Sequence, residues 1–572
     1  MLSRFRASGW FAPILLLSLA LVTALAGWLT PDKKYSDIPT LAGPEESPVE
    51  GGVFRFPLLG YFETLDPARA RFDVEVLLVQ QLFDGLTAFD DQLNVVPALA
   101  QYWRIEDDGK TYTFELRDDA KFHNSRPVTA EDCVFSFERL LSKELNESNY
   151  QYYSRIEGAQ EFRDGSTDHV AGLRAIDDRT FQIRFTTPYV PALSVLSMYS
   201  SKILPKEELL AMGEEAFFEQ PVGTGAFSFS RWIGHEEDPA LPIVDGIPQG
   251  VRVEANPFYF AGRPYLDAVV FRAVTNREGF APTAPLSERF DCLETTADSQ
   301  AWSAVEARRL LALKYVILPT HIAPYDDPRV RRALNYALDK RSFLDVVAAT
   351  AGTPEANGII PPGIPGFAST PTKHGHDLEE ARRLLAEAGF PDGMGLPPLE
   401  IPVLQQSEND EYPRPSSVRR GCLESCFYKL GVTIKHIPVD QLVEIGDPAY
   451  ADRPVLYGGT WFADFPDPDS FLRPLFHTDG AMNQNGYSNV LVDDLLDQVV
   501  SETSYTKRTK TYREVERLVL LDSPIIPTDY GRLRYLVRPN VRGFRLIPLG
   551  TGYINLRHVW LIEDESESEV EL

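Results

Sequence analysis

Cysteine and positive charge are both scarce in this sequence of 572 residues. It has only four cysteines, at positions 133, 292, 422 and 426, and they lack the paired C-x-x-C spacing of a structural zinc site. Lys and Arg number 56 against 83 Asp and Glu, which gives a net charge of −27. A chain with this charge repels phosphate groups, so nucleic acid is not expected as a partner. Disulfide bonds and structural zinc are not expected to hold the fold.

The common signatures of catalysis are also missing. The sequence contains no G-x-S-x-G, no H-E-x-x-H and no G-x-x-x-x-G-K. The pair Gly223 and Gly225 lacks the further glycine and lysine of a phosphate loop, and predicts a turn that leads into a strand. His374 and His376 are only two possible ligands on a loop, and we do not expect them to hold a metal. We therefore expect no catalytic residue, no metal and no cofactor, and disfavour a hydrolase of exported peptides.

The N-terminus has the features of an export segment. Arg4 and Arg6 precede an uncharged apolar run over residues 10–29. The run is long enough to span a bilayer, yet the sequence ALA at 24–26 resembles a signal-peptide cleavage site. A cleaved signal peptide and a retained membrane anchor therefore both stay open, whereas a lipid-modified N-terminal cysteine is not expected. The protein is predicted to be exported, to the periplasm or the outer face of the cytoplasmic membrane.

Strand and helix patterns alternate through the rest of the chain, which predicts a mixed α and β body. Residues 111–117 and 180–185 alternate apolar and polar side chains behind acidic turn residues, as strands of hairpins do. Asp327 and Pro328 predict the start of a helix that ends near Lys340. A second helix is predicted from Asp377 to Gly389, with a capping box at its start. Cys422 and Cys426 are one helical turn apart and are expected to line a core.

One segment carries an unusual density of aromatic and acidic side chains. The sequence WFADFPDPD at residues 461–469 contains three carboxylates, and its two prolines prevent an ordinary helix. It lacks the oxygen pattern of a calcium loop. Capping of a helix that starts near Ser470 explains Asp467 or Asp469. It does not explain Asp464 as readily, so this carboxylate is a candidate for contact with a ligand.

The order of several motifs resembles the large extracytoplasmic solute-binding proteins that deliver peptides, and sometimes other solutes, to ABC importers. The resemblance covers about residues 51–535. The matching motifs are TLDPA at 64–68, LFDGL at 82–86, PALA at 97–100, DGKTYTF at 108–114, PVTAED at 127–132, PVGTG at 221–225, NPFY at 256–259, GRP at 262–264, DPRVRRALNYA at 327–337, residues 381–389, YSN at 487–489 and DD at 493–494.

This resemblance implies a two-lobed α/β fold of the periplasmic binding protein type, with a hinge and an inserted subdomain. The implied segments are the signal or anchor (1–29), a proline-rich tether (30–51), lobe I (52–90, 205–310 and 524–561), the inserted subdomain (91–204), lobe II (311–523) and an acidic tail (562–572).

The resemblance also implies a ligand site. In peptide-binding members an aspartate in a Trp-x-Ala-Asp segment pairs with the α-ammonium of the peptide, and Trp461, Ala463 and Asp464 stand at these positions. Their neighbours Phe462 and Phe465 are included in the expected site. Tyr61 and Phe62 are expected to line the cleft from the opposite lobe.

The function implied is a monomeric, non-enzymatic capture protein that binds a peptide or related small solute and delivers it to the permease subunits of an ABC importer. Two departures leave the ligand class open: RFDC at 289–292 stands where an acidic motif is common, and LPT at 318–320 replaces a usual asparagine. A non-peptide solute binder, or a membrane-anchored sensor of the same fold, is the alternative.

Overall fold

The computed structural model divides the chain into residues 1–46 and 47–572, and only the second unit contains described residues. These are residues 47–60, 62–106, 109–145, 147–234, 249–274, 289–294, 304–345, 353–369, 375–404, 415–439, 448–450 and 452–562. The predicted export segment and most of the tether therefore lie outside the described residues, as does all but the first residue of the acidic tail. Within the described ranges, no helix is long and apolar enough to cross a bilayer.

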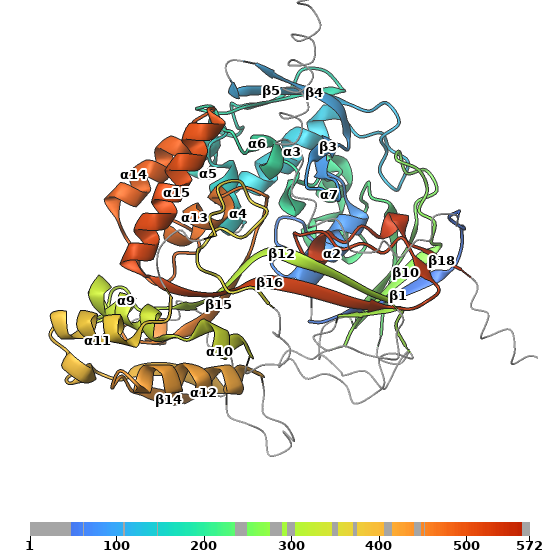
Figure 1. Cartoon of the computed structure of the whole chain (residues 1–572). Helices are drawn as coiled ribbons and strands as arrows, with labels where there is room; N and C mark the ends of the chain where they lie inside the picture. The colour runs from blue at the N-terminus through green and yellow to red at the C-terminus, as the bar shows by residue number, and fades with distance from the viewer. Residues whose placement is uncertain are drawn as a thin grey trace, which may run out of the picture. The chain divides into compact units, whose positions relative to one another are not determined.

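One four-stranded sheet joins distant parts of the chain. β1 (Val53–Leu58) pairs in parallel with β10 (Ala268–Ala273), and β9 (Gly250–Ala255) and β8 (Phe227–Ile233) continue the sheet in antiparallel order (Figure 1). The pairing of β1 with β10 brings together two segments that are far apart in the sequence, as expected for a first lobe built from discontinuous pieces. The segment boundaries themselves stay a prediction.

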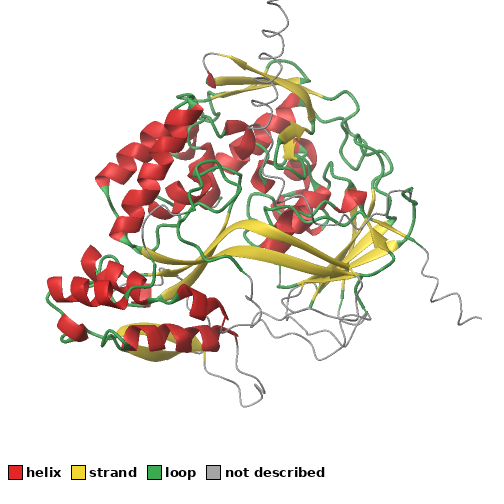
Figure 2. Cartoon of the chain, in the orientation of Figure 1, coloured by secondary structure: helices red, strands yellow, loops and turns green. Residues whose placement is uncertain are grey.

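Two long strands form the centre of a second sheet. β12 (Ala304–Ile317) and β16 (Ile525–Val537) run antiparallel, with β11 (Cys292–Glu294) on one edge and β15 (Tyr457–Phe462) on the other. They are the two longest arrows in Figure 2. Their register shifts between Arg309 and Leu313, so the two halves of the ribbon pair differently. β15, which precedes the acidic segment, is positioned by this ribbon.

A third sheet confirms the predicted hairpin strands. Its order is β4 (Ala100–Glu106), β5 (Thr111–Leu116), β7 (Thr180–Arg184) and β6 (Leu173–Ala175), all antiparallel. The alternating apolar side chains of residues 111–117 and 180–185 are buried, as the pattern predicts. Asp177 makes the expected turn, because its carboxylate accepts hydrogen bonds from the backbone N–H groups of Arg179 and Thr180.

Both predicted helices are present, with two corrections. α11 (Leu378–Glu387) is capped by Asp377, but the predicted capping box does not form, because the side chain of Glu380 pairs with Arg383. α9 (Pro328–Ala337) begins as expected, with Asp327 accepting a hydrogen bond from the N–H of Arg329. Its predicted end near Lys340 is wrong, because the helix stops at Ala337. Asp339 instead caps a new helix, α10 (Lys340–Asp345), by accepting the backbone N–H of Ser342. A residue that caps the next helix cannot also continue α9.

The remaining helices and strands connect and cover these sheets. They are α2 (Asp73–Leu82), β2 (Thr87–Phe89), β3 (Val95–Pro97), α3 (Ala130–Leu141), α4 (Glu147–Tyr153), α5 (Ala159–Arg163), α6 (Ala192–Val195), α7 (Lys206–Met212), α8 (Glu214–Glu219), β13 (Leu399–Leu404), α12 (Pro415–Tyr428), β14 (Ile434–Val439), α13 (Asp469–Phe476), α14 (Val490–Val499), α15 (Tyr505–Asp522), β17 (Val541–Arg542) and β18 (Trp560–Leu561).

Three large hydrophobic clusters hold these elements. One lies mainly within residues 86–203, one is shared by β12, α13, α14 and α15, and one lies among α9, α11 and α12. The first also contains Phe465 and Val500, so the predicted inserted subdomain packs against the predicted second lobe. All four cysteines are free, and Cys422 and Cys426 pack in or against the third cluster, as expected.

The glycines at 223 and 225 form a tight structural turn before β8, as predicted. A Cβ atom at Gly223 would lie 1.9 Å from the carbonyl oxygen of Leu82, and one at Gly225 would lie 2.2 Å from that of Gln81. Only glycine therefore permits this approach of two backbone segments.

We predict that Gly223→Ala destabilises the folded body, by the upper end of the range of about 1 to 3 kcal/mol seen for overpacking, because backbone has to move. Thermal unfolding of the purified protein would show a clear drop in the midpoint. Gly421→Ala is the matched control, since nothing lies within 4 Å of its added methyl group. Equal midpoints for the two variants would contradict the close approach.

Candidate functional site

The acidic segment follows directly on β15. In this strand Trp461 lies opposite Leu313 of β12, and Phe462 lies opposite Ala312. The backbone N–H of Ala463 still donates to the carbonyl of Leu311, after which the chain leaves the sheet. Residues 464–468 then form the connection to α13, as expected for a segment with two prolines. Asp464 therefore lies just past the end of a strand that is held by the central ribbon.

Two of the three carboxylates have structural roles. Asp467 receives two hydrogen bonds from the guanidinium of Arg508, at 2.7 and 2.8 Å, and accepts the backbone N–H of Asp469. Asp469 accepts the hydroxyl of Tyr512 at 3.0 Å and lies 3.3 Å from Arg473. Both aspartates are buried. Asp467 takes part in the start of α13 by accepting the N–H of Asp469, which agrees with the prediction that one of the two aspartates caps this helix, whereas the ion pairs of both were not predicted.

Asp464 differs because it has no cation beside it. Its carboxylate accepts a hydrogen bond of 2.5 Å from the hydroxyl of Tyr152, and its backbone N–H donates to Ser470 Oγ at 2.9 Å. Among the described residues it takes part in no ion pair. Burial raises the pKa of Asp464 to about 6, the hydrogen bond from Tyr152 opposes this rise, and the charge of Asp73 adds to it. The carboxylate is thus charged at neutral pH without a counterion in the described structure.

Aromatic side chains surround this carboxylate. The fully buried ring of Phe465 meets that of Tyr152 edge to face, with 5.5 Å between centroids, and so holds Tyr152 in place. The indole N–H of Trp461 donates to the carbonyl of Ser470 at 2.7 Å. The hydroxyl of Tyr553 donates to the backbone carbonyl of Asp464 at 3.5 Å. Trp461 and Phe465 therefore fix the loop that carries Asp464.

The other expected site residues lie in different surroundings. Ala463 is buried in the second hydrophobic cluster, and Phe462 is partly exposed. Phe62 is 2% exposed and stacks on Trp232, with 6.0 Å between ring centroids, so the structure gives it a packing role. Tyr61 lies outside the described residues.

Sequence reasoning missed the tyrosines of this site. Tyr152 lies in α4, 312 residues before Asp464, and Tyr199 and Tyr553 belong to two further segments. The pKa values of Tyr199 and Tyr553 are raised by burial and by the charge of Asp464. Only the density of tyrosine at positions 150, 152 and 153 offered a signal, and no local spacing linked it to Asp464.

The two sides of the site meet at further points. The backbone N–H of Val190 donates to the carbonyl of Val500 at 3.2 Å, and Arg155 lies 3.7 Å from Asp497. As to metal, the described residues contain no group of three or more His, Cys, Asp or Glu that is arranged to hold an ion. His376 is exposed, and His374 is outside the described ranges.

Comparison with curated proteins finds relatives that align over most of their length. The chain is 29% identical to "Heme-binding protein A" of Haemophilus influenzae, over 82% of this chain and 85% of that protein. It is 29% identical to "Probable di/tripeptide-binding protein 5" of Pseudomonas aeruginosa, with 82% and 88% covered. It is 26% identical to the "Dipeptide-binding protein" of Escherichia coli, with 80% and 84% covered.

Solved structures share the fold. The murein tripeptide binding protein MppA of Escherichia coli superimposes with a TM-score of 0.74 at 22% identity, over 90% of this chain and 100% of that chain. The OppA protein of Haemophilus influenzae, solved with the peptide RPPGFSPFR, gives 0.73 at 24% identity with the same coverage. These superpositions confirm the expected fold class, the two-lobed α/β fold of periplasmic binding proteins.

A family model settles the relationship. The model described as "Bacterial extracellular solute-binding proteins, family 5 Middle" matches residues 94–483, which is more than half of the chain. The resemblance inferred from the ordered motifs is confirmed by this match. The chain belongs to the family 5 bacterial extracellular solute-binding proteins.

Proposed function

We propose that this solute-binding protein captures short peptides by their α-ammonium group at Asp464 and delivers them to the permease subunits of an ABC importer. The observation that carries the proposal is the carboxylate of Asp464, which is charged at neutral pH and has no cation partner among the described residues. A peptide ammonium supplies the missing positive charge. The residues around it are already fixed, so little has to be ordered when the ligand arrives.

The strength of such a contact follows from its surroundings. A hydrogen bond between two ionised groups is about twice as strong as a neutral one, and it is stronger still away from water. Tyr152 occupies one oxygen of Asp464, which leaves the other oxygen for the ammonium. Asp464 is partly exposed, so removal of one partner of this pair should cost toward the lower end of the about 2 to 5 kcal/mol seen for buried charge pairs.

The names of most of these relatives support a peptide as the ligand. Two of the similar proteins described above are named for dipeptides or for di- and tripeptides, and a third is named for heme. All peptides share a backbone ammonium, which a single carboxylate recognises whatever the side chains are. A heme ligand has no ammonium and would make no use of an unpaired Asp464.

Closure of the two lobes accounts for delivery. Tyr152 and Asp464 come from opposite sides of the site, so a ligand that contacts both favours the closed arrangement. In this proposal the closed form is recognised by the permease, and residues 1–29 direct export as a cleaved signal or a retained anchor. No covalent chemistry is required, so the protein is proposed to have no enzymatic activity.

We predict that Asp464→Asn weakens binding of unblocked dipeptides at least tenfold, because the amide cannot neutralise an ammonium. Calorimetry with a panel of dipeptides and their N-acetylated forms measures this. Asp494→Asn is the control, since Asp494 is exposed on α14. Equal affinity in the two variants, or equal binding of acetylated peptides to the unaltered protein, would refute the role of Asp464.

Binding is also predicted to release protons near pH 6. The pKa of Asp464 is raised to about 6 in the free protein, and an adjacent ammonium lowers it, so the bound state holds fewer protons. Affinity should therefore increase from pH 5 to pH 7. Calorimetry at pH 6 in two buffers of different ionisation enthalpy gives the number of protons released. Asp464→Asn should abolish the release, and its persistence in that variant would assign it to another group.

A further inference from the structure

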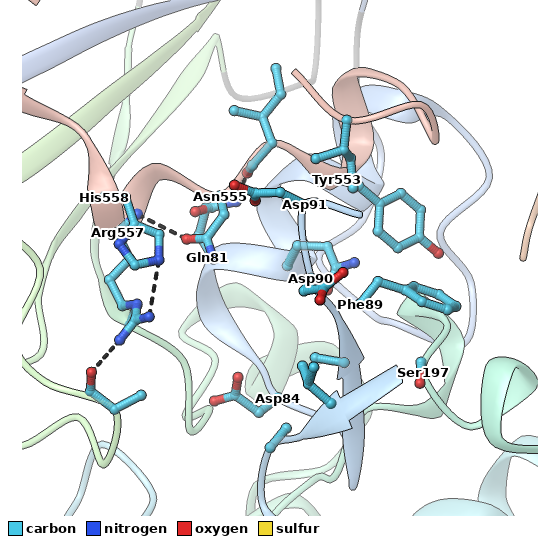
Figure 3. A pocket seen from close by; sticks show the side chains of 18 of the residues that line it. Gln81, Asp84, Phe89, Asp90, Asp91, Ser197, Tyr553, Asn555, Arg557 and His558 are labelled. Atoms are coloured by element: carbon cyan, nitrogen blue, oxygen red, sulfur yellow. Dashed lines mark hydrogen bonds between the residues drawn. The ribbon is translucent and has the colours of Figure 1, made fainter. Parts of the chain in front are cut away.

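A separate cavity of about 520 Å³ lies between α2, β2 and the C-terminal residues 547–558 (Figure 3). This volume is within the range of about 300 to 1,000 Å³ that is typical of small-molecule sites. Its floor includes the buried side chains of Gln81 and Ser197, and its exposed rim includes Asp91 and His558. The cavity is open to solvent and has a polar floor.

This cavity is distinct from the site of Asp464. Asp464 is not among the residues that line it, and neither is Tyr152. Tyr553 separates the two sites: it lines the cavity, and its hydroxyl donates to the backbone carbonyl of Asp464. Figure 3 shows Tyr553 beside Phe89, and their rings meet edge to face at 6.3 Å. These two rings give one side of the cavity an apolar surface.

The carboxylates of the cavity already have hydrogen-bond donors. Asp84 accepts the hydroxyls of Tyr259 at 3.0 Å and Thr224 at 3.2 Å. Asp90 accepts backbone and side-chain N–H groups of the turn that follows it. Asp91 pairs with Arg545 at 2.9 Å. No carboxylate in the cavity therefore depends on a ligand for its partner.

Two cations of the cavity, Lys202 and Arg557, are not paired with a carboxylate in the described structure. Lys202 is only 6% exposed and lines the cavity, and its ammonium has neither a hydrogen bond nor an ion pair within the described part of the chain. Arg557 donates to the carbonyl of Ala261 and contacts His558, neither of which is an anion. The ammonium of Lys202 is thus available to an anion that enters the cavity. Burial lowers the pKa of Lys202 to about 8, and the charge of Asp84 opposes this.

We infer that this cavity is a second solute site, which takes a small organic monocarboxylate with its anionic end at Lys202 and its apolar part against Phe89 and Tyr553. The ammonium of Lys202, which has no hydrogen-bond acceptor among the described residues, selects an anion. The acidic rim and the net charge of −27 disfavour anions of higher charge. The inference is independent of the peptide proposal, because it concerns different residues and a ligand group of opposite charge.

Calorimetry of the full chain with benzoate tests the inference. Benzoate should bind the unaltered protein at one site that Lys202→Met weakens at least tenfold. Lys206→Met is the matched control, because the ammonium of Lys206 forms an exposed ion pair with Glu131 and does not line the cavity, and the variant should leave the affinity unchanged. Asp464→Asn should also have no effect. Binding should weaken as the pH rises above about 8, where Lys202 loses its proton.

A second measurement does not depend on any variant. Benzoate should slow acetylation of Lys202 by acetic anhydride at least threefold, relative to Lys206 in the same sample, as read by mass spectrometry of the digested protein. Absence of both binding and protection would overturn the inference, and would leave the cavity as a space in which water bridges Lys202 and Asp84. Benzoate binding that becomes tighter in Asp464→Asn and is insensitive to Lys202→Met would likewise overturn it, because the anion would then occupy the first site.

Discussion

The proposed capture of a peptide depends on Asp464, a charged carboxylate that has no counterion among the described residues. A carboxylate that loses water and gains no cation is unfavourable, and the raised pKa of Asp464 expresses this cost. The surrounding structure maintains it nevertheless, because the central ribbon positions β15 and because Ser470, Tyr152 and Tyr553 fix the loop after it. In the proposed function, a ligand ammonium removes this cost when it binds.

This arrangement has a consequence for stability. A folded-state pKa of about 6, above the ordinary value of 3.8, means that the empty protein is relatively more stable in acid. That advantage is fully present below about pH 4 and is lost as the pH rises through 6. At neutral pH the charged Asp464 therefore lowers the stability of the folded protein, and the proposed ligand ammonium would offset this loss. Such an exchange of stability for function is common at binding sites.

The sequence singles out Asp464 but not the residues that surround it. Helix capping explains Asp467 or Asp469 but not Asp464, and in the structure Asp467 accepts the N–H of Asp469 while both of these aspartates also form contacts that no local pattern indicates. Tyr152 was missed because a contact across 312 residues leaves no local pattern. The end of α9 was misplaced because periodicity continued past Ala337, whereas the cap made by Asp339 decided where the next helix begins.

Lys202 is a second example of a residue whose surroundings cannot be predicted from local sequence. In the sequence it is a lysine between a serine and an apolar pair, with nothing to indicate burial. Its environment arises only when α2, the segment around Tyr259 and the C-terminal residues 547–558 pack around it. Local strands, turns and caps were thus predictable, whereas cavities formed by several distant segments were not.

A crystal structure of the protein with a bound dipeptide tests the central claim most directly. The account predicts the α-ammonium nitrogen within hydrogen-bond distance of the carboxylate of Asp464, with Tyr152 still donating to the other oxygen. A dipeptide bound elsewhere, or one whose ammonium is neutralised by a different carboxylate, would contradict it.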